Sequence, residues 1–580
     1  MKKRLICLAL AAMLLLALAA CSTSPTTSPN TDAPNTDAPN TDTPENTTPD
    51  PDEPITTLQV FSMPSNTSGL QDNSYWAEIL REDLNVQIEM MPAGDQAVDK
   101  LQTYMSAGKF PDIVIFKDDY TQVSNAIEAG LLINLDEHQA ALPNAFANAA
   151  NGIEYFRNEV SNGTGLLYAL PNGVTTQSST AGITSSGPYL RWDLYAQLGY
   201  PEIVELEDYL SVLQQMLDLE PTNPDGQKNY GISIWSDWDG DFNYPARVVQ
   251  EFYGVSPEGF GFVERDYVNN TFTSIFDDSS YYKRALKFYY TANQMGLLDP
   301  DSLTHGFGDY WGKAESGRVM FSYWSWGFGG YNTDDKTSEG IGFKPVYFTN
   351  EKQLSDDGPK YIGGQNAYAI SKDTQYLDKA LQFVDYMYSY DGLWKLALGK
   401  QGEYWDLDGT TPYVTERGWE MKAQNLEFAA GGLVGAGLNT INSFGMPWFV
   451  KHPVYGYRMD TEDWEKKDFA PEDSALDMAW RDYMKADNDL DYLSQHNMTV
   501  MPPFAPMGTI PDDIAETKSR IADTVKTESW KMIFAKNDAE FEKLFSDMGE
   551  KAMGMGADTV DQWMITTYET ALVDGAQYMK

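Results

Sequence analysis

The chain has 580 residues, of which 42% are hydrophobic and 13% aromatic, so it can bury more than one hydrophobic core. Its formal net charge of −44 excludes a strongly basic surface of the kind that binds phosphate backbones, and we expect no nucleic-acid partner. The two cysteines, Cys7 and Cys21, lie close to the N-terminus, so we expect the rest of the chain to fold without disulfides.

The N-terminus has the composition of a secretory signal peptide. Lys2, Lys3 and Arg4 precede an apolar run, Leu5 to Leu18, that is too short to span a membrane comfortably. The following residues complete the sequence LAAC, which resembles the bacterial lipobox, where the cysteine thiol accepts a diacylglyceryl group. We predict a signal peptide over residues 1–20 and a lipid anchor on Cys21, at the extracellular face of the bacterial cytoplasmic membrane. The alternative is an ordinary cleavage site that precedes a cysteine.

Residues 21–54 are of low complexity and include the near-repeat NTDAPNTDAPNTDTP. Asn, Thr, Asp and Pro cannot build a core, and the negative charges repel one another, so this segment is predicted to be a disordered tether. Extended at roughly 3.1 Å per residue, it could reach on the order of 100 Å. No later run of about 18 apolar residues follows, so we predict no transmembrane span.

The body begins with alternating strand and helix patterns joined by short connections. Apolar spacing predicts, in chain order, a strand over Leu58–Phe61, a helix over Tyr75–Leu84, a strand over Val86–Met90, a helix over Val98–Met105 and a strand over Ile113–Phe116. This order is typical of a parallel sheet with helices on both faces. Ligands bind beyond the carboxyl ends of such strands, and Asp118 and Asp119 follow the third strand closely.

Further helices are predicted over Glu205–Leu219, from Tyr282 to Tyr289 and from Leu377 to Tyr388, and a strand over Ala367–Ile370. Gln365 and Asn366 introduce that strand, and Trp448 lies in a later loop. The C-terminal part is predicted to be mainly helical. Its apolar stripes are Ile514, Ile521, Val525 and Met532, then Phe541, Leu544, Phe545 and Met548.

Two strand patterns end in aromatic residues. The run GISI ends in Trp235, with Trp238 three residues later, and the run VMF ends in Tyr323, Trp324 and Trp326 before several glycines. Large rings on a glycine-rich backbone suit the rim of a cleft, and core packing is the alternative. If the backbone stays extended, Trp324 and Trp326 share the open face and Tyr323 is buried behind them.

A set of motifs in a fixed order resembles a known family. MSAGKFPDIVIF, GLLINLDEH, YLRWDLYAQLGYP, ESGRVMFSYWSW and GGQNAYAISKDTQYLDKALQFVDYMYSYDG are similar to segments of extracellular solute-binding protein family 1, the substrate-binding lipoproteins of sugar ABC importers. The length of the chain resembles the long form found in Firmicutes. The resemblance implies an α/β, two-lobed periplasmic-binding-protein-like (Venus-flytrap) fold with parallel-sheet lobes and extra C-terminal helices. Lobe 1 would comprise residues 55–175 and 360–449, and lobe 2 residues 176–359 and 450–580.

The resemblance also implies a function. The protein would be a monomer that captures an oligosaccharide between its lobes and delivers it to ABC permease subunits, without enzymatic activity. By analogy, Asp118 or Asp119 would accept hydrogen bonds from sugar hydroxyls. The other residues expected at the ligand are Trp235, Trp238, Tyr323, Trp324, Trp326, Gln365, Asn366 and Trp448.

The sequence gives little support for a bound cofactor or for enzymatic activity. Some relatives carry a calcium loop of the form Asp-x-Asn-x-Asn-Gly; here Pro221 takes the first ligand position and Asn229 the ninth, so we expect no cofactor, or at most weakly held calcium. Two alternatives remain open: a surface glycoside hydrolase or lyase, and a stand-alone glycan-binding module. The sequence has no Gly-x-Ser-x-Gly elbow, and its four histidines are scattered without metal-ligand spacing.

Overall fold

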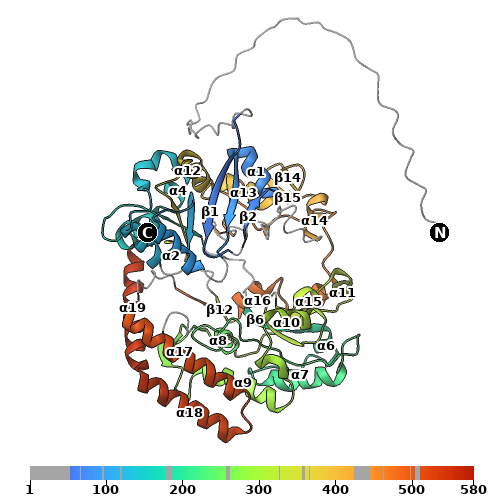
Figure 1. Cartoon of the computed structure of the whole chain (residues 1–580). Coiled ribbons are helices and arrows are strands. Elements are labelled where there is room, and N and C mark those ends of the chain that lie inside the picture. Colours follow the sequence, from blue (N-terminus) through green and yellow to red (C-terminus); the bar gives the residue numbers. More distant parts are fainter. Residues whose placement is uncertain are drawn as a thin grey trace, which may run out of the picture. The chain divides into compact units, whose positions relative to one another are not determined.

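The computed structural model describes residues 53–579 except 66, 73, 94–96, 118–119, 178–185, 257–260, 326, 356–359, 365, 424–444, 448, 462, 497 and 503–509. Helices and strands alternate through most of this part of the chain (Figure 1). Its sheets divide into one large sheet and a hairpin in the first part and smaller sheets in the second. Among the described residues, no helix is both long and apolar enough to cross a membrane.

The large sheet contains the three strands predicted near the start of the body. Its strand order is β2 (Gly69–Gln71), β3 (Val86–Met91), β1 (Thr56–Ser62), β4 (Ile113–Phe116), β13 (Ala367–Ile370) and β5 (Leu170–Pro171). The central pairs β3–β1 and β1–β4 are parallel, while β2, β13 and β5 pair in the antiparallel sense. The predicted parallel arrangement is therefore confirmed at the centre of this sheet only.

The helices of this first part include the three predicted ones, which are α1 (Tyr75–Leu84), α2 (Ala97–Ala107) and α12 (Leu377–Tyr386). The others are α3 (Thr121–Glu128), α4 (Pro143–Asn148), α5 (Ala150–Tyr155), α13 (Tyr390–Leu398) and α14 (Glu416–Ala423). Helix α1 begins where the Ser74 side chain accepts a hydrogen bond from the backbone N–H of Ala77, and it ends where Asn85 adopts a left-handed conformation. Local capping thus places both predicted ends of this helix.

The second part has an antiparallel sheet, which differs from the prediction of parallel strands in both lobes. Its order is β10 (Phe321–Trp324), β6 (Ser186–Arg191) and β11 (Phe343–Pro345), and both outer strands run opposite to β6. At the predicted strand run GISI and the residue before it, the structure has isolated parallel bridges, from Tyr230 to Val319 and from Ile232 to Leu298. An apolar run indicates burial and leaves strand direction undetermined, because direction depends on which distant segment pairs with it.

The other elements of the second part are short strands and many helices. The strands are β7 (Val255–Ser256), β8 (Val263–Asp266), β9 (Thr271–Ser274) and the pair β12 (Leu354–Ser355) and β16 (Thr499–Val500). The helices are α6 (Trp192–Gln197), α7 (Asp208–Leu219), α8 (Tyr244–Glu251), α9 (Tyr281–Gln294), α10 (Phe307–Glu315), α11 (Asp334–Ser338), α15 (Ala475–Met484), α16 (Asp489–Gln495), α17 (Asp512–Ile533), α18 (Asp538–Met555) and α19 (Ala557–Gln577). The hairpin of β14 (Trp405–Asp408) and β15 (Thr411–Val414) belongs to the first part, because Trp405 and Val414 are buried with residues of the large sheet.

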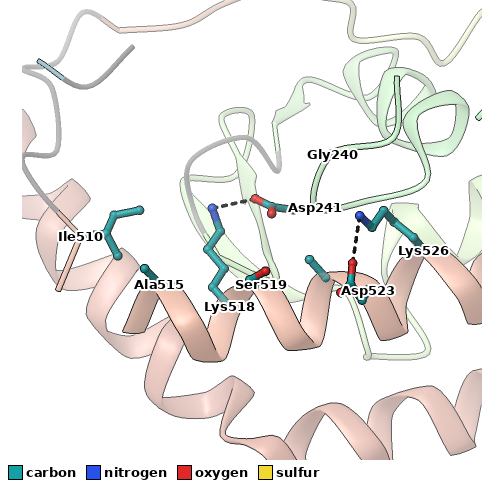
Figure 2. Close-up of a pocket in the computed structure, with 9 residues that line it drawn as sticks. Gly240, Asp241, Ile510, Ala515, Lys518, Ser519, Asp523 and Lys526 are labelled. Carbon is teal, nitrogen blue, oxygen red and sulfur yellow. Dashed lines mark ion pairs between the residues drawn. The ribbon is translucent and has the colours of Figure 1, made fainter. Parts of the chain in front are cut away.

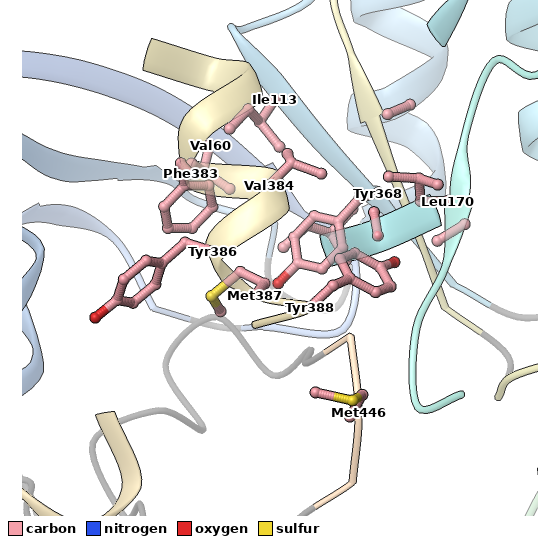
Figure 3. Close-up of a cluster of buried hydrophobic side chains, with 14 of the residues drawn as sticks. Val60, Ile113, Leu170, Tyr368, Phe383, Val384, Tyr386, Met387, Tyr388 and Met446 are labelled. Carbon is pink, nitrogen blue, oxygen red and sulfur yellow. The ribbon is translucent and has the colours of Figure 1, made fainter. Parts of the chain in front are cut away.

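Buried hydrophobic side chains form two large clusters, here called the first core and the second core. The first core surrounds the large sheet, and Figure 3 shows α12 packed there through Phe383 and Val384. The second core surrounds the antiparallel sheet and includes side chains of α7, α8, α9 and α17. Val450, Met459 and Trp464 are buried in the first core, although the sequence analysis assigned residues after 449 to the second lobe.

The C-terminal helices pack against the second core, as their apolar stripes predict. Helices α17 and α18 lie side by side (Figure 1) and bury Ile521, Val525, Phe541 and Phe545 there. Helix α19 begins in the second core and ends at the first, where the buried Tyr578 hydroxyl donates a hydrogen bond to Glu159 at 2.9 Å. The last helix therefore contributes side chains to both cores.

One buried carboxyl on α19 makes stability depend on pH. Asp561 is 7% exposed, and its Oδ1 accepts a hydrogen bond of 2.6 Å from the backbone N–H of Phe262. Burial raises the pKa of Asp561 from 3.8 to about 7, and the charge of Asp558 adds to the shift. Between these two pH values the unfolded chain has lost this proton while the folded chain keeps it. The contribution of Asp561 to the free energy of unfolding therefore falls as pH rises through this window.

We expect Asp561→Asn to remove this pH-dependent loss of stability. The amide oxygen still accepts the hydrogen bond from the Phe262 N–H, and the amide group does not titrate. The difference in the free energy of unfolding, variant minus native, should increase from pH 5 to pH 8, by at most about 1.4 kcal/mol per pH unit. Urea unfolding at the two pH values measures this. Glu569→Gln, on the exposed face of the same helix, is the matched control. A native–variant difference that is equal at both pH values would contradict the assignment.

Candidate functional site

The predicted site residues divide into those the structure describes and those it does not. Asp118, Asp119, Trp326, Gln365 and Trp448, and Cys21 with the predicted tether up to residue 52, lie outside the described residues. The remaining ones are Trp235, Trp238, Tyr323, Trp324 and Asn366.

Asn366 lies immediately before β13, which pairs with β4 and β5 in the large sheet. Its backbone N–H donates to Asn172 Oδ1 at 3.1 Å, and its carbonyl accepts from the Asn172 N–H at 3.1 Å. The turn before it requires glycine, because Gly363 has a φ of +94° and a Cβ there would meet the carbonyl oxygen of Asn172 at 2.6 Å. These contacts hold Asn366 in place while leaving it half-buried.

Trp235 is a core residue. Its side chain is 0% exposed, and its ring lies 4.3 Å from that of Tyr310 and 5.7 Å from that of Tyr323. Trp238 is half-buried, stacks on Phe307 at 4.5 Å and contacts Tyr244 edge-on at 5.7 Å. Of the two tryptophans predicted from this strand end, Trp238 is therefore the one with surface available to a ligand.

Strand β10 corrects the expected arrangement of the second aromatic run. All four of its residues are buried; Tyr323 is 2% exposed and Trp324 is 7% exposed, so Trp324 does not lie on an open face. The register shifts between Ser322 and Trp324, where the Ser322 hydroxyl accepts a hydrogen bond from the Trp324 N–H at 3.1 Å. This irregularity interrupts the simple alternation of faces on which the prediction relied.

Five aromatic side chains form a continuous row at this site, here called the aromatic row. Successive ring centroids are 6.0, 5.7, 4.5 and 5.6 Å apart. Its members, in spatial order, are Trp324, Tyr244, Trp238, Phe307 and Trp311. All except Trp324 are half-buried, so the row combines packing against the second core with partly open ring surface. Apolar ring faces of this kind match the C–H faces of sugar rings.

Two carboxylates hold the starts of the helices to which Phe307 and Tyr244 of the aromatic row belong. Asp237 Oδ2 accepts the backbone N–H of Phe307 at 2.8 Å, at the start of α10, and Asp239 Oδ1 accepts that of Tyr244 at 2.7 Å, at the start of α8. Trp530 Nε1 donates to Asp239 Oδ2 at 2.5 Å. Burial raises the pKa of Asp239 to about 6, against the opposing effect of these hydrogen bonds. Both carboxylates therefore have positioning roles.

Sequence reasoning missed Tyr244, Phe307 and Trp311. Tyr244 and Phe307 are the first residues of their helices, and Trp311 lies one turn after Phe307. The only sequence signal for Tyr244 is the preceding Asn243, whose side chain caps α8 by accepting the Ala246 N–H at 3.1 Å. Their proximity to Trp238 depends on contacts between distant segments.

In the loop that the sequence analysis compared with a calcium site, the side chains at two ligand positions already form hydrogen bonds with nearby backbone groups. Asn223 Oδ1 accepts the Gln227 N–H at 2.9 Å, and Asn229 Nδ2 donates to the Glu220 carbonyl at 2.9 Å. Pro221 has no side-chain oxygen at the first ligand position, and the Asn223 and Asn229 side chains are already used in these hydrogen bonds, so the residues present do not fit the ion. Within the described ranges, no group of three or more His, Cys, Asp or Glu side chains is arranged to hold a metal.

A cavity of about 280 Å³ lies between α17 and the loop that follows Trp238 (Figure 2). Its lining consists of Gly240, Asp241, Ile510, Ala515, Lys518, Ser519, Ala522, Asp523 and Lys526. Lys518 Nζ forms an ion pair with Asp241 at 2.6 Å, and Lys526 Nζ forms one with Asp523 at 3.2 Å. The charges of the cavity are therefore balanced, with two ammonium groups paired with two carboxylates, beside apolar surface from Ile510, Ala515 and Ala522.

An α/β chain with two hydrophobic cores and a partly open aromatic row has the features of a binding protein. The profile of a family described as "Bacterial extracellular solute-binding protein" matches residues 76–403, more than half of the chain. The chain belongs to this family, whose members act outside the cell. Among curated proteins, none matches the chain significantly.

Solved structures share the fold at low sequence identity. An HMO-binding, ABC-transporter-associated solute-binding protein from Bifidobacterium longum infantis is 16% identical, with a TM-score of 0.55 over 90% of this chain and 100% of that one. The Streptococcus pneumoniae substrate-binding protein FusA in complex with kestose is 14% identical, with a TM-score of 0.57 over 89% and 100%. The N-glycan transport protein NgtS of the same species is 14% identical, with a TM-score of 0.51 over 90% and 99%. The fold is thus that of two-lobed solute-binding proteins.

The different burial of the two tryptophans predicts different costs of removal. Trp235→Ala should lower the free energy of unfolding by about 3–5 kcal/mol, because it opens a cavity in the second core. Trp238→Ala should cost less than half as much, because its ring is half-buried. Urea unfolding followed by circular dichroism measures both values. Equal costs would show that Trp238 is also a core residue.

Proposed function

We propose that this protein is the substrate-binding component of a carbohydrate ABC importer, and that it captures an oligosaccharide without altering it. The observation that carries this proposal is the aromatic row. Four neighbouring aromatic side chains of the row are only half-buried, which suits a chain of sugar rings better than a single small solute. Membership in the solute-binding family supports capture, and the structural neighbours named for HMO, kestose and N-glycan binding support the ligand class.

In this proposal the two cores belong to two lobes that close over the glycan. The aromatic row supplies the stacking surface of the second lobe, and Asn366 supplies a polar contact from the first. Asp118, Asp119, Gln365, Trp326 and Trp448 remain proposed ligand contacts on the evidence of their sequence positions. Contacts made only in the closed state shift the equilibrium toward closure, and the closed form docks as a monomer on the permease subunits.

A panel of glycans tests capture. The panel contains fructo-, gluco-, manno-, galacto- and xylo-oligosaccharides, each from the mono- to the hexasaccharide, together with human milk oligosaccharides, N-glycans and oligouronates. We expect saturable binding of at least one series by calorimetry and unchanged glycan by chromatography. Trp238→Ala should weaken that binding about 10- to 100-fold, or ~1.4–2.8 kcal/mol. Thr527→Ala, on the exposed surface of α17, should leave it unchanged.

Recovery of shortened glycan would replace this proposal with the hydrolase or lyase alternative. A panel in which nothing binds would overturn the ligand class. Binding that survives Trp238→Ala unchanged would remove the aromatic row from the site.

We further propose that Cys21 carries a lipid anchor and that residues 22–54 tether the body near its permease. The support is the sequence LAAC after the apolar run and the repeat that follows it. A tether raises the effective concentration of the binding protein at the transporter. Two acyl chains are needed for a stable anchor, because one chain gives only marginal binding.

Expression in a Gram-positive host tests the anchor. The native protein should fractionate with the membrane, and its N-terminal peptide should carry diacylglycerol by mass spectrometry. Cys21→Ala should release the folded protein to the medium, while Cys7→Ala, within the predicted signal peptide, should not. Membrane association that survives Cys21→Ala would contradict the lipid anchor.

A further inference from the structure

The cavity beside the aromatic row has one wall made by a single helix face. Ala515, Lys518, Ser519, Ala522 and Lys526 are three or four residues apart along α17, so they project from the same side, as Figure 2 shows for those it labels. The opposite wall is the short stretch Gly240–Asp241, which follows Trp238 in the loop. Two segments far apart in sequence therefore form it, and it is open to the surface, because Gly240, Ala515, Ser519 and Asp523 are exposed.

Hydrogen bonds outside the cavity also join the loop after Trp238 to helix α17. Asp239 lies between Trp238 and the cavity wall, and it accepts hydrogen bonds from Trp530 of α17 and from the backbone of Tyr244. This bridge ties the middle of the aromatic row to the helix that lines the cavity. A ring stacked at Trp238 therefore has the cavity beside it along the same loop.

The charges of the cavity favour an uncharged ligand. Each lysine is already paired, Lys518 with Asp241 at 2.6 Å and Lys526 with Asp523 at 3.2 Å. The carboxylates can accept hydrogen bonds from hydroxyl groups, while the ammonium groups and the Ser519 hydroxyl can donate them. An anion would have to displace a carboxylate from its lysine. The alanine side chains and Ile510 add apolar surface for the C–H groups of a sugar.

The size of the cavity limits what can enter. Its volume of about 280 Å³ is slightly below the range of roughly 300–1,000 Å³ typical of sites for drug-sized ligands. One sugar ring is smaller than such ligands, whereas a chain of several rings is larger. The cavity therefore has room for a single sugar ring.

We propose that this cavity is a subsite for the terminal, uncharged sugar ring of the glycan whose neighbouring rings stack on the aromatic row. The inference rests on the proposed function and extends it, because it assigns the recognition of chain length and of charge to named residues. Lys518, Ser519 and Asp241 bind the hydroxyl groups of the terminal ring. Glycans too short to reach from Trp238 into the cavity bind without it.

Filling the cavity tests the assignment. Ser519→Trp places an indole in the cavity, and Thr527→Trp places the same side chain on the exposed surface of the same helix as the matched control. The probes are the mono- to hexasaccharide ladders of the panel above, measured by calorimetry. We expect Ser519→Trp to weaken the longest bound members at least tenfold and to leave the shortest bound member within twofold of the native protein. Thr527→Trp should change neither.

A second variant applies if Ser519→Trp does not fold, as judged by its thermal transition. Asp241→Asn preserves shape and removes a charged acceptor, and it should weaken only the longer glycans, by about threefold or more. Unchanged affinity at every length, an equal loss at every length, or tighter binding of oligouronates than of neutral ladders would overturn the subsite while leaving glycan capture intact. A panel in which no glycan binds overturns the proposed function and the subsite together.

Discussion

Two carboxylates of one loop hold the candidate site together. Asp237 and Asp239 accept backbone N–H groups at the starts of α10 and α8, and Asp239 also accepts the indole N–H of Trp530 on α17. The first residues of helices have N–H groups without intrahelical acceptors, so these bonds satisfy groups that would otherwise be unpaired. They also supply donors to Asp239, the more buried of the two carboxylates, whose burial would otherwise be costly. Three helices from different parts of the chain are thereby fixed around one loop.

Polar and aromatic residues alternate in this loop because the carboxylates accept backbone N–H groups while the aromatic rings pack. Trp235 anchors it in the second core, while Trp238 stacks on Phe307 at its surface. A side chain at Gly306 would displace the Asp237 carboxylate from its present position, because a Cβ there would lie against it. A binding surface made of rings needs such rigid supports, since stacking loses free energy when the rings must first be ordered. Aromatic packing beneath the row provides that rigidity without disulfides.

Local sequence patterns predicted the elements well where capping and periodicity agree. Helix α1 and strand β4 have the predicted bounds. Helix α7 begins at Asp208, three residues after the predicted Glu205, because the Asp208 carboxylate accepts the N–H groups of Val204 and Glu205 and holds them in a turn. The direction of the strands around β6 was wrong, because the partners of β6 come from more than 100 residues further along the chain.

The sequence by itself determined the elements, the family motifs and the aromatic character of the site, because each depends on residue types at short spacing. Tertiary structure alone decided which rings are open. Trp235 and Trp324 are covered by side chains such as Tyr310 and Tyr244 from other elements, whereas Trp238 keeps part of its surface. It also brought Tyr244 and Phe307 beside Trp238, and α17 beside Asp241 to form the cavity. Burial is a property of contacts between distant segments, and no local pattern specifies which segments meet.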